Sequence, residues 1–420
     1  MRKAKNIFEN IDYLSVILYL LLVFIGFFNI YASEYNDDSN EIFNLSKRHG
    51  KQLLFIFISS LIAFFLIIID WKFFFSLSFI IYALSISSLI LILFIGKITN
   101  GSLSWFDFGS FRIQPSEFAK FATSLALARY INLFSIKKFN LSKTILCISI
   151  ITIPLLLIII QNDTGTALIF LSFILVLYRE GLTENILIFG LSIFVLTIMC
   201  LIIDFFTLIM VLVIISCIIF YFLKKKKKNL INIIILVFFC ISYSYFINYT
   251  VKNILPKHQS ERIMVVLGQK KDPHGIGYNV IQSKIAIGSG GLIGKGYLKG
   301  TQTRFDFVPE QSTDFIFCTI GEEWGFLGAL IFISLYISLL LRVLFLSERQ
   351  RSNFSRVYGY SVACILFFHF IINIGMTIGL FPVVGIPLPF ISYGGSSLIS
   401  FTMLLFVFLN LDSYRLQILR

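Results

Sequence analysis

The chain has 420 residues, of which 57% are hydrophobic and 14% charged, and its mean hydropathy is +0.89. This composition excludes a soluble globular domain of that length and indicates an integral membrane protein. The net charge of +13 falls in short segments between apolar runs, so no nucleic-acid partner is expected. The six cysteines form no CxxC pair and the four histidines no HExxH pattern, which argues against a disulfide framework or a zinc enzyme.

The apolar runs predict the fold class. A helix that crosses a bilayer needs about 20 mostly apolar residues. By that measure we predict a single all-α polytopic membrane domain over residues 1–420 with about twelve transmembrane helices. The predicted spans are 13–32, 52–69, 74–95, 115–134, 144–160, 165–180, 184–203, 205–223, 229–249, 314–341, 357–376 and 395–411.

The basic segments predict the orientation. When the helices are threaded from a cytoplasmic "MRKAK", the segments "SIKKFNLSK", "YRE", "KKKKK", "RVLFLSERQRSNFSR" and "YRLQILR" share one side. The positive-inside rule therefore predicts cytoplasmic N and C termini. The opposite, extracytoplasmic side receives "SEYNDDSNE", "GSLSWFDFGSFRIQ" and one large loop at 250–313.

The first polar cluster in chain order is "FRIQPSEFAKFA". Pro115 suits a first helical turn, and the three-residue spacing of Glu117 and Lys120 puts them on one helix face. Inside a membrane such a pair is either a structural ion pair or part of a functional cavity. Arg112 and Gln114, on the outer side, are placed to meet a polar headgroup.

The second cluster, "QNDTGTA", is a tight outer turn between two spans. Asp163 stands at the start of a helix, so helix capping is the simplest explanation for it.

The large loop at 250–313 is the only polar segment long enough to build a site outside the membrane. Its stretch "KIAIGSGGLIGKGYLKGTQ" is not a Walker A motif, because Ser289 and Gly296 stand where Gly and Ser or Thr are required. The glycines could let backbone N–H groups approach a phosphate-bearing lipid, with Lys284, Lys295 and Lys299 nearby. A merely solvated loop is the alternative.

Two further segments flank the last spans. In "PEQSTDFIF", Ser312 or Thr313 could cap a helix with Asp314 in its first turn, where the carboxylate would serve only the helix dipole. In "FPVVGIPLPFISYGGSS", three prolines within eight residues cannot lie in a regular helix. Such backbone is tolerated at membrane depth only when it is buried in protein or lines a wet cavity, so we expect it to shape one. Ser392 and Gly394 in this segment are candidate substrate contacts.

Together, "QPSEFAK", "IQSKIAIGSGGLIGKGYLKGTQ", "PEQSTDFIF" and "PLPFISYGGSS" resemble the SEDS family of bacterial cell-wall proteins (shape, elongation, division and sporulation). The likeness spans about 45–180 and 255 to the end. The sequences "FPVVGIPLP" and "SKIAIGSGGLIGKGYLKGTQ" favour the elongation branch over the division branch. Three apolar runs at 184–250 stand where the family's plan of about ten helices has one, which predicts two extra helices.

The resemblance implies a peptidoglycan glycosyltransferase in the bacterial cytoplasmic membrane, with its active site on the outer face. It would polymerise lipid II onto a glycan strand linked to undecaprenyl pyrophosphate, with a class B penicillin-binding protein and the elongation machinery as partners. The family's catalytic Asp corresponds to Asp314, a general base for an inverting transfer. The leaving pyrophosphate would be stabilised by Arg48, Arg112 or Lys120, or by a divalent metal such as Mg²⁺ or Mn²⁺. Asp163 is the candidate contact for that metal or for the substrate.

The remaining candidate substrate-binding residues are Gln114, Glu117, Lys284, Lys295, Ser392 and Gly394. Two other functions are compatible with the sequence. Polar residues inside a many-helix protein often mark a translocation path, so a flippase for the lipid-linked precursor is the main alternative. A scaffold that only recruits the crosslinking partner is the other.

Overall fold

A computed structural model describes residues 10–35, 43–99, 101–109, 112–133, 141–203, 205–222, 227–254, 264, 277–305 and 307–415. Most of the predicted large loop before residue 277 therefore lies outside the described residues. The chain divides into two compact units, one made of Met1–Leu182 with Asn279–Arg420 and the other of Thr183–Tyr278. The second unit contains the apolar runs that the sequence sets apart from the family plan.

A helix stands at each predicted span, and the span at 165–180 is divided into two short helices. Among the described residues, seven helices are long and apolar enough to cross a membrane, namely α1, α2, α3, α5, α14, α15 and α16, and shorter apolar helices accompany them. The predicted polytopic membrane protein is confirmed at this level, while the total of twelve spans stays a prediction. The first unit is built from α1 (Tyr13–Ser33), α2 (Arg48–Ile68), α3 (Trp71–Ile95), α4 (Pro115–Leu133), α5 (Leu141–Ile160), α6 (Thr164–Phe170), α7 (Phe173–Arg179), α12 (Tyr278–Ser289), α13 (Thr301–Arg304), α14 (Ile316–Glu348), α15 (Asn353–Thr377) and α16 (Gly395–Ser413).

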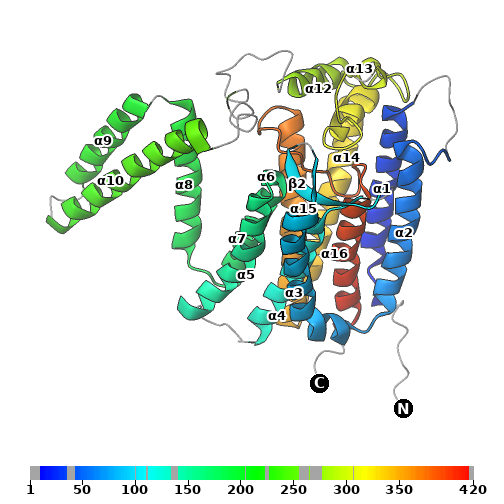
Figure 1. Cartoon of the computed structure of the whole chain (residues 1–420), viewed down its shortest axis with the longest axis horizontal. Helices are drawn as coiled ribbons and strands as arrows, with labels where there is room; N and C mark the ends of the chain where they lie inside the picture. The colour runs from blue at the N-terminus through cyan, green and yellow to red at the C-terminus, as the bar shows by residue number, and fades with distance from the viewer. Residues whose placement is uncertain are drawn as a thin grey trace. The chain divides into compact units, whose positions relative to one another are not determined.

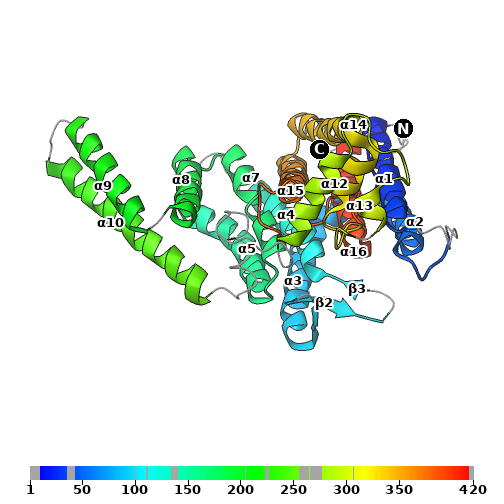
Figure 2. The same ribbon diagram turned by 90° about the horizontal axis from the view of Figure 1, so that it is seen from above.

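The second unit is described separately. It consists of α8 (Glu184–Ile202), α9 (Phe205–Phe222) and α10 (Lys227–Tyr249), followed by the short π-helix Thr250–Ile254. The helices α9 and α10 pack against each other as an antiparallel pair, and α8 packs against α10 (Figure 2).

Helix α4 is too polar to meet the criterion for a membrane span, and its surroundings explain why. It packs against α3, α5, α15 and α16, and 15 of its 19 residues are buried. A helix enclosed by other helices needs no apolar face toward lipid, so it can carry the polar side chains of the site.

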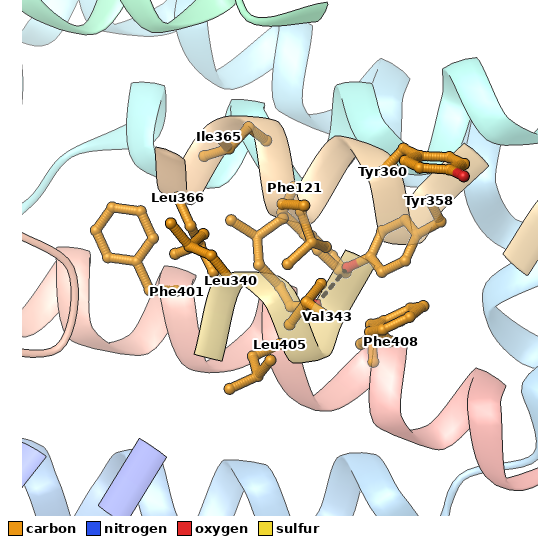
Figure 3. Close-up of a cluster of buried hydrophobic side chains, with 14 of the residues drawn as sticks. Phe121, Leu340, Val343, Tyr358, Tyr360, Ile365, Leu366, Phe401, Leu405 and Phe408 are labelled. Carbon is orange, nitrogen blue, oxygen red and sulfur yellow. Dashed lines mark hydrogen bonds between the residues drawn. The ribbon is translucent and has the colours of Figure 1, made fainter. Parts of the chain in front are cut away.

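The core of the first unit lies between α4, α14, α15 and α16 (Figure 3). Phe121 of α4 meets Tyr358 of α15 there, and the Tyr358 hydroxyl donates to the Leu404 carbonyl of α16 at 3.1 Å. Tyr336 and Phe370 stack with ring centroids 4.4 Å apart. Close packing and hydrogen bonds of this kind hold helices together in lipid, where the hydrophobic effect between helices is weak.

A small antiparallel sheet interrupts the helical pattern between α3 and α4, which an all-α prediction missed. Its strands are β1 (Lys97–Thr99), β2 (Ser102–Asp107) and β3 (Arg112–Ile113), in the order β1-β2-β3. The Leu103 N–H donates to the Gln161 carbonyl at 2.9 Å, which ties the sheet to the turn between α5 and α6. Arg112 pairs with Asp107 across β2 and β3, so the sheet fixes the entry into α4.

The two ends of the first unit differ. Helices α12 and α13 lie across one end, over the ends of the bundle helices (Figures 1 and 2). The start of α1 and the end of α16 lie at the other end (Figure 1). There the Arg349 Nε donates to Asp412 of α16 at 3.1 Å, and the Arg356 Nη2 donates to Glu180 at 2.8 Å. These ion pairs connect helix ends on the side that the sequence predicts to be cytoplasmic.

Candidate functional site

Asp314 lies in the turn that precedes α14. The helix begins at Ile316, its N-cap is Phe315, and no side chain caps it there. The expectation that Asp314 occupies the first helical turn is therefore wrong. The carboxylate is half-buried, and its Oδ2 lies 3.5 Å from the point where a Cβ on Gly385 would stand. Gly385 is exposed and has φ +70°, so the carboxylate lies beside accessible backbone.

Three successive carbonyls of this turn are fixed by hydrogen bonds. The Ser312 carbonyl accepts from the Tyr393 N–H at 2.9 Å, and the Thr313 carbonyl accepts from the Ser392 hydroxyl at 2.6 Å. The Asp314 carbonyl accepts from the side-chain amide of Asn373 at 2.8 Å. The backbone that carries the carboxylate is therefore held by α15 and by the segment before α16.

Arg48, the first residue of α2, reaches the same turn. Its Nη1 donates to the Ser312 hydroxyl at 2.7 Å and lies 3.5 Å from the Glu310 carboxylate. Its Nε lies 3.8 Å from Glu34. The side chain is still 44% exposed. Two carboxylates and a hydroxyl thus orient a guanidinium that contacts the turn at Ser312 and keeps an open face.

The segment 381–394 between α15 and α16 is irregular, as its prolines predict. Residues 388–392 are buried in protein, and glycines on neighbouring helices let the segment approach closely. A Cβ on Gly26 of α1 would stand 2.7 Å from the Ile391 Cα, and a Cβ on Gly165 of α6 would stand 2.3 Å from the Val384 carbonyl oxygen. The irregular backbone is thus stabilised by enclosure, as the membrane requires.

Ser392 and Gly394, two candidate substrate contacts, make hydrogen bonds within the protein. The Ser392 hydroxyl donates to Thr313 and also accepts from the Leu388 N–H at 2.8 Å. The Gly394 N–H donates to Gln52 of α2 at 3.4 Å. Both residues therefore support the shape of the segment. Burial raises the pKa of the adjacent Tyr393 phenol above its ordinary value, although Arg48 nearby lowers it.

Asp163 caps α6. Its Oδ1 accepts from the Thr166 N–H at 3.1 Å. Its Oδ2 accepts from the Gln114 side-chain amide at 2.8 Å, from the Thr166 hydroxyl at 2.9 Å and from the Ser116 hydroxyl at 3.2 Å. Within the described residues, no group of three or more His, Cys, Asp or Glu side chains could hold a metal. Both carboxylate oxygens of Asp163 already accept hydrogen bonds from these donors, so its surroundings do not fit a resident divalent cation.

Arg112 and Gln114 meet the segment near the start of α16. The Ser396 hydroxyl donates to the Arg112 carbonyl at 2.9 Å and accepts from the Gln114 N–H at 3.3 Å. The Arg112 side chain is 57% exposed, and its Nε lies 3.8 Å from Asp107. Arg112 is thus a second guanidinium with an open face, fixed to the same segment as the Asp314 turn.

Glu117 and Lys120 belong to a buried network in which neither side chain is more than 1% exposed. The Lys120 ammonium donates to Glu117 at 2.9 Å and lies 2.7 Å from the Nε2 of His369. The Nδ1 of His369 lies 3.0 Å from the Pro387 carbonyl, and the Ser400 hydroxyl donates to Glu117 at 3.1 Å. These distances fit a neutral imidazole that accepts from Lys120 and donates to Pro387. The network therefore joins α4, α15 and α16 to the proline segment.

The glycine-rich motif packs on a break in α14. Gly325 has φ +65° inside this helix, which disrupts the regular hydrogen bonds on both sides of it. A Cβ on Gly294 would stand 2.2 Å from the Glu323 carbonyl oxygen, so only glycine permits the contact. The motif supplies the missing partners through four backbone hydrogen bonds, from Lys295 to Glu322 (3.0 Å), from Gly296 to Glu323 (3.0 Å), from Phe326 to Gly291 (2.9 Å) and from Leu327 to Leu292 (3.0 Å).

Two of the three lysines of this stretch contact other parts of the first unit. The Lys295 ammonium donates to Glu322 at 2.6 Å and to the Thr301 hydroxyl at 2.7 Å. The same Glu322 carboxylate accepts N–H groups of α13, including that of Thr301 at 2.8 Å. Lys284 of α12 lies against Gly379, where a Cβ would stand 2.6 Å from the ammonium nitrogen. These contacts and the break in α14 account for the glycines and these two lysines of the motif without a bound anion.

The segment 381–397 brings most of the predicted site residues together. It contacts the Asp314 turn through Ser392 and Tyr393, the Arg112 strand through Ser396, and the Lys120 network through Pro387. Lys284 and Lys295 lie instead with α12 and the break in α14.

Sequence reasoning missed two residues of α15 that contact this segment, His369 and Asn373. They stand four residues apart in the otherwise apolar stretch 362–376 of this helix, and that spacing puts two polar side chains on one face. This signal could have identified both.

Comparisons with known proteins identify the family of the chain. The sequence profile of the cell cycle protein family FtsW/RodA/SpoVE matches residues 12–204 and 187–417. The peptidoglycan glycosyltransferase MrdB of Escherichia coli is 37% identical over 320 residues, which cover 76% of this chain and 73% of MrdB. The peptidoglycan glycosyltransferase RodA of Treponema pallidum is 32% identical and covers 93% of this chain and 94% of its own length.

Solved structures give the same result. A chain of a peptidoglycan synthase complex that coordinates polymerization and crosslinking has a TM-score of 0.71 at 27% identity, covering 97% of this chain and 99% of its own. The rod shape determining protein RodA of Thermus thermophilus has a TM-score of 0.62 at 23% identity, covering 96% and 97%, and shows the fold alone. The chain is a multi-pass membrane protein that belongs to the SEDS family (FtsW/RodA/SpoVE).

Proposed function

We propose that this protein polymerises lipid II into glycan strands on the outer face of the bacterial cytoplasmic membrane, with a RodA-like role in cell elongation. By homology to MrdB and RodA the chain is a peptidoglycan glycosyltransferase. The lipid-linked substrate, the elongation role and the orientation belong to the proposal. The observation that carries it is the fixed turn of Asp314, whose carboxylate lies beside accessible backbone and whose Ser312 accepts a hydrogen bond from the half-exposed Arg48.

In the proposed reaction Asp314 acts as general base. Its carboxylate takes the proton of the acceptor 4-hydroxyl, and the oxygen attacks the anomeric carbon of the donor sugar from the face opposite the pyrophosphate. The bond between that carbon and the pyrophosphate oxygen breaks, and the leaving group keeps the electron pair. The configuration at the carbon is therefore inverted. A positioned base of this kind contributes roughly 10²–10⁴-fold.

The leaving pyrophosphate needs positive charge close by. Arg48 and Arg112 suit this role, because each guanidinium is partly exposed and planar and can bind phosphate oxygens in pairs. Lys120 is enclosed and paired with Glu117 and His369, so we propose that it supports the segment 381–394. A bound divalent cation could add Lewis-acid stabilisation, but the donors around Asp163 favour capping over metal binding there.

The proposed partner is a class B penicillin-binding protein that crosslinks the new strand within the elongation machinery. The structural neighbour from a peptidoglycan synthase complex supports this proposal. Membership of the family also allows the roles of FtsW and SpoVE. The stage V sporulation protein E of Bacillus subtilis is 31% identical, over 96% of this chain and 97% of its own length.

The test is polymerisation of purified lipid II by the full chain with its partner, for wild type and Asp314→Asn. Asn keeps the shape of the side chain but cannot accept a proton as a base, so we expect loss of polymer by at least about 10²-fold with lipid II binding retained. Wild-type rates in Asp314→Asn would sink the assignment of the base. Lipid transport into liposomes without any polymer would favour a flippase, and normal cell shape in Asp314→Asn cells would favour a scaffold.

A further inference from the structure

Asn373 connects the Asp314 turn to the proline segment from inside the protein. It lies on α15 and is fully buried. Its side-chain amide donates to the Asp314 carbonyl at 2.8 Å and to the Ile386 carbonyl at 2.7 Å. Ile386 directly follows Gly385, the residue over which the Asp314 carboxylate lies. One side chain thus fixes the two backbone segments whose separation determines where that carboxylate stands.

We propose that Asn373 is a positioning residue for Asp314, an inference that rests on the proposed function. Its two N–H groups hold the backbone of the base and the backbone of the neighbouring segment at a fixed spacing. The Ser312 and Thr313 carbonyls are held by the segment before α16, and the Phe315 N–H, which belongs to the same peptide as the Asp314 carbonyl, donates to the Glu310 carbonyl at 3.2 Å. Without Asn373, the Asp314 carbonyl loses its hydrogen bond to α15 and the Asp314 turn loses this link to the backbone at Ile386. A misplacement of about 1 Å at a reacting group costs on the order of 10²-fold in rate.

The chain contains a matched control in Asn410 of α16. This residue is also fully buried, and its side-chain amide also donates to two carbonyls, those of Ile67 at 2.9 Å and Ile69 at 2.8 Å. In both asparagines the Oδ1 has no hydrogen-bond partner among the described residues. Asn410 connects α16 to the end of α2, close to Asp412 and away from the Asp314 turn. Replacing either residue therefore removes two hydrogen bonds from a buried amide to backbone carbonyls, but only the replacement of Asn373 does so beside Asp314.

The experiment compares Asn373→Leu and Asn410→Leu in the full chain with its partner. Leucine has a similar volume but no donor, so each variant leaves two buried carbonyls without a hydrogen bond, and we expect similar losses in Tm. We expect only Asn373→Leu to lose about 10²-fold in kcat for lipid II polymerisation, with KM unchanged within about threefold. A kcat in Asn373→Leu within threefold of that of Asn410→Leu would overturn the inference.

A second variant covers the case in which Asn373→Leu does not fold. Asn373→Gln keeps the carboxamide but moves it by one methylene, so we expect a kcat at least about tenfold below wild type with KM preserved. A wild-type kcat in Asn373→Gln would then overturn the inference. Asp314→Asn is measured alongside to separate the two claims. If Asp314→Asn is active, the proposed role of Asp314 as base is contradicted. If Asp314→Asn is inactive but the Asn373 variants have wild-type kcat, only the positioning role of Asn373 is contradicted.

Discussion

At the residue scale, Gly385 is the position where a small change meets Asp314 directly. Its φ of +70° is unfavourable for an L side chain by roughly 1–2 kcal/mol. Its Cβ would also stand 3.5 Å from the Asp314 Oδ2 and cover that side of the carboxylate. We therefore expect Gly385→Ala to lower kcat by about tenfold or more. Steady-state polymerisation kinetics would measure this.

Gly109 provides the control for that substitution. It has φ +78°, so alanine there is unfavourable for the same reason, but nothing lies within 4 Å of its Cβ position. Gly109→Ala should therefore lower Tm by a similar amount and leave kcat unchanged. Equal losses of kcat in the two variants would mean that backbone strain, and not the contact with Asp314, limits the rate.

The site was only partly predictable at this scale. Asp314 could be identified because its motif is continuous in sequence and resembles a family. Asn373 and Ser392 support it through hydrogen bonds to carbonyl oxygens, which every residue has, so no sequence motif marks those partners. Asp163 is the opposite case, since the capping predicted from its position before a helix is what the structure contains.

At the scale of elements, the glycine motif and α14 form one unit. The break at Gly325 leaves carbonyl and N–H groups without helical partners, and the motif supplies partners for both kinds. The sequence predicts the glycines but gives no indication that a helix lies against them, because helix breaks at glycine depend on tertiary contacts. The small sheet before α4 was missed for a similar reason, since its strands are short and lie between two strong helical signals.

This arrangement predicts the effect of alanine at Gly294. The φ of this residue is +87°, and its Cβ would collide with the Glu323 carbonyl at 2.2 Å, so the motif must move off α14. We expect the amides of Lys295 and Gly296 to exchange hydrogen at least about tenfold faster in Gly294→Ala, as measured by mass spectrometry. Gly288→Ala, with open space around its Cβ, should exchange as wild type does. Unchanged exchange in Gly294→Ala would contradict the docking of the motif.

At the scale of the whole molecule, hydropathy indicated the membrane class and the helix positions, because apolar length is a property of the sequence alone. It could not reveal how the helices divide into units. Polar residues in α4 are tolerated because α3, α5, α15 and α16 surround that helix, and that enclosure depends on pairing between segments far apart in the chain. The contact pattern assigns α8, α9 and α10 to a unit of their own, a region that the sequence distinguished only by three apolar runs in place of one.

That division leads to a prediction about the extra helices. Deleting Phe205–Tyr249 removes α9 and α10 together, an even number of spans, so all later segments keep their sides of the membrane. The deleted residues lie in the second unit, whereas the Asp314 turn, the segment 381–394 and the Lys120 network all belong to the first unit. We expect the shortened protein to polymerise lipid II at a rate within about threefold of wild type.

Deleting α10 alone is the control. It removes one span and should abolish activity, because it opposes the charge pattern of every later loop. Loss of polymerisation in the paired deletion, with the protein still folded, would mean that α9 and α10 take part in the reaction.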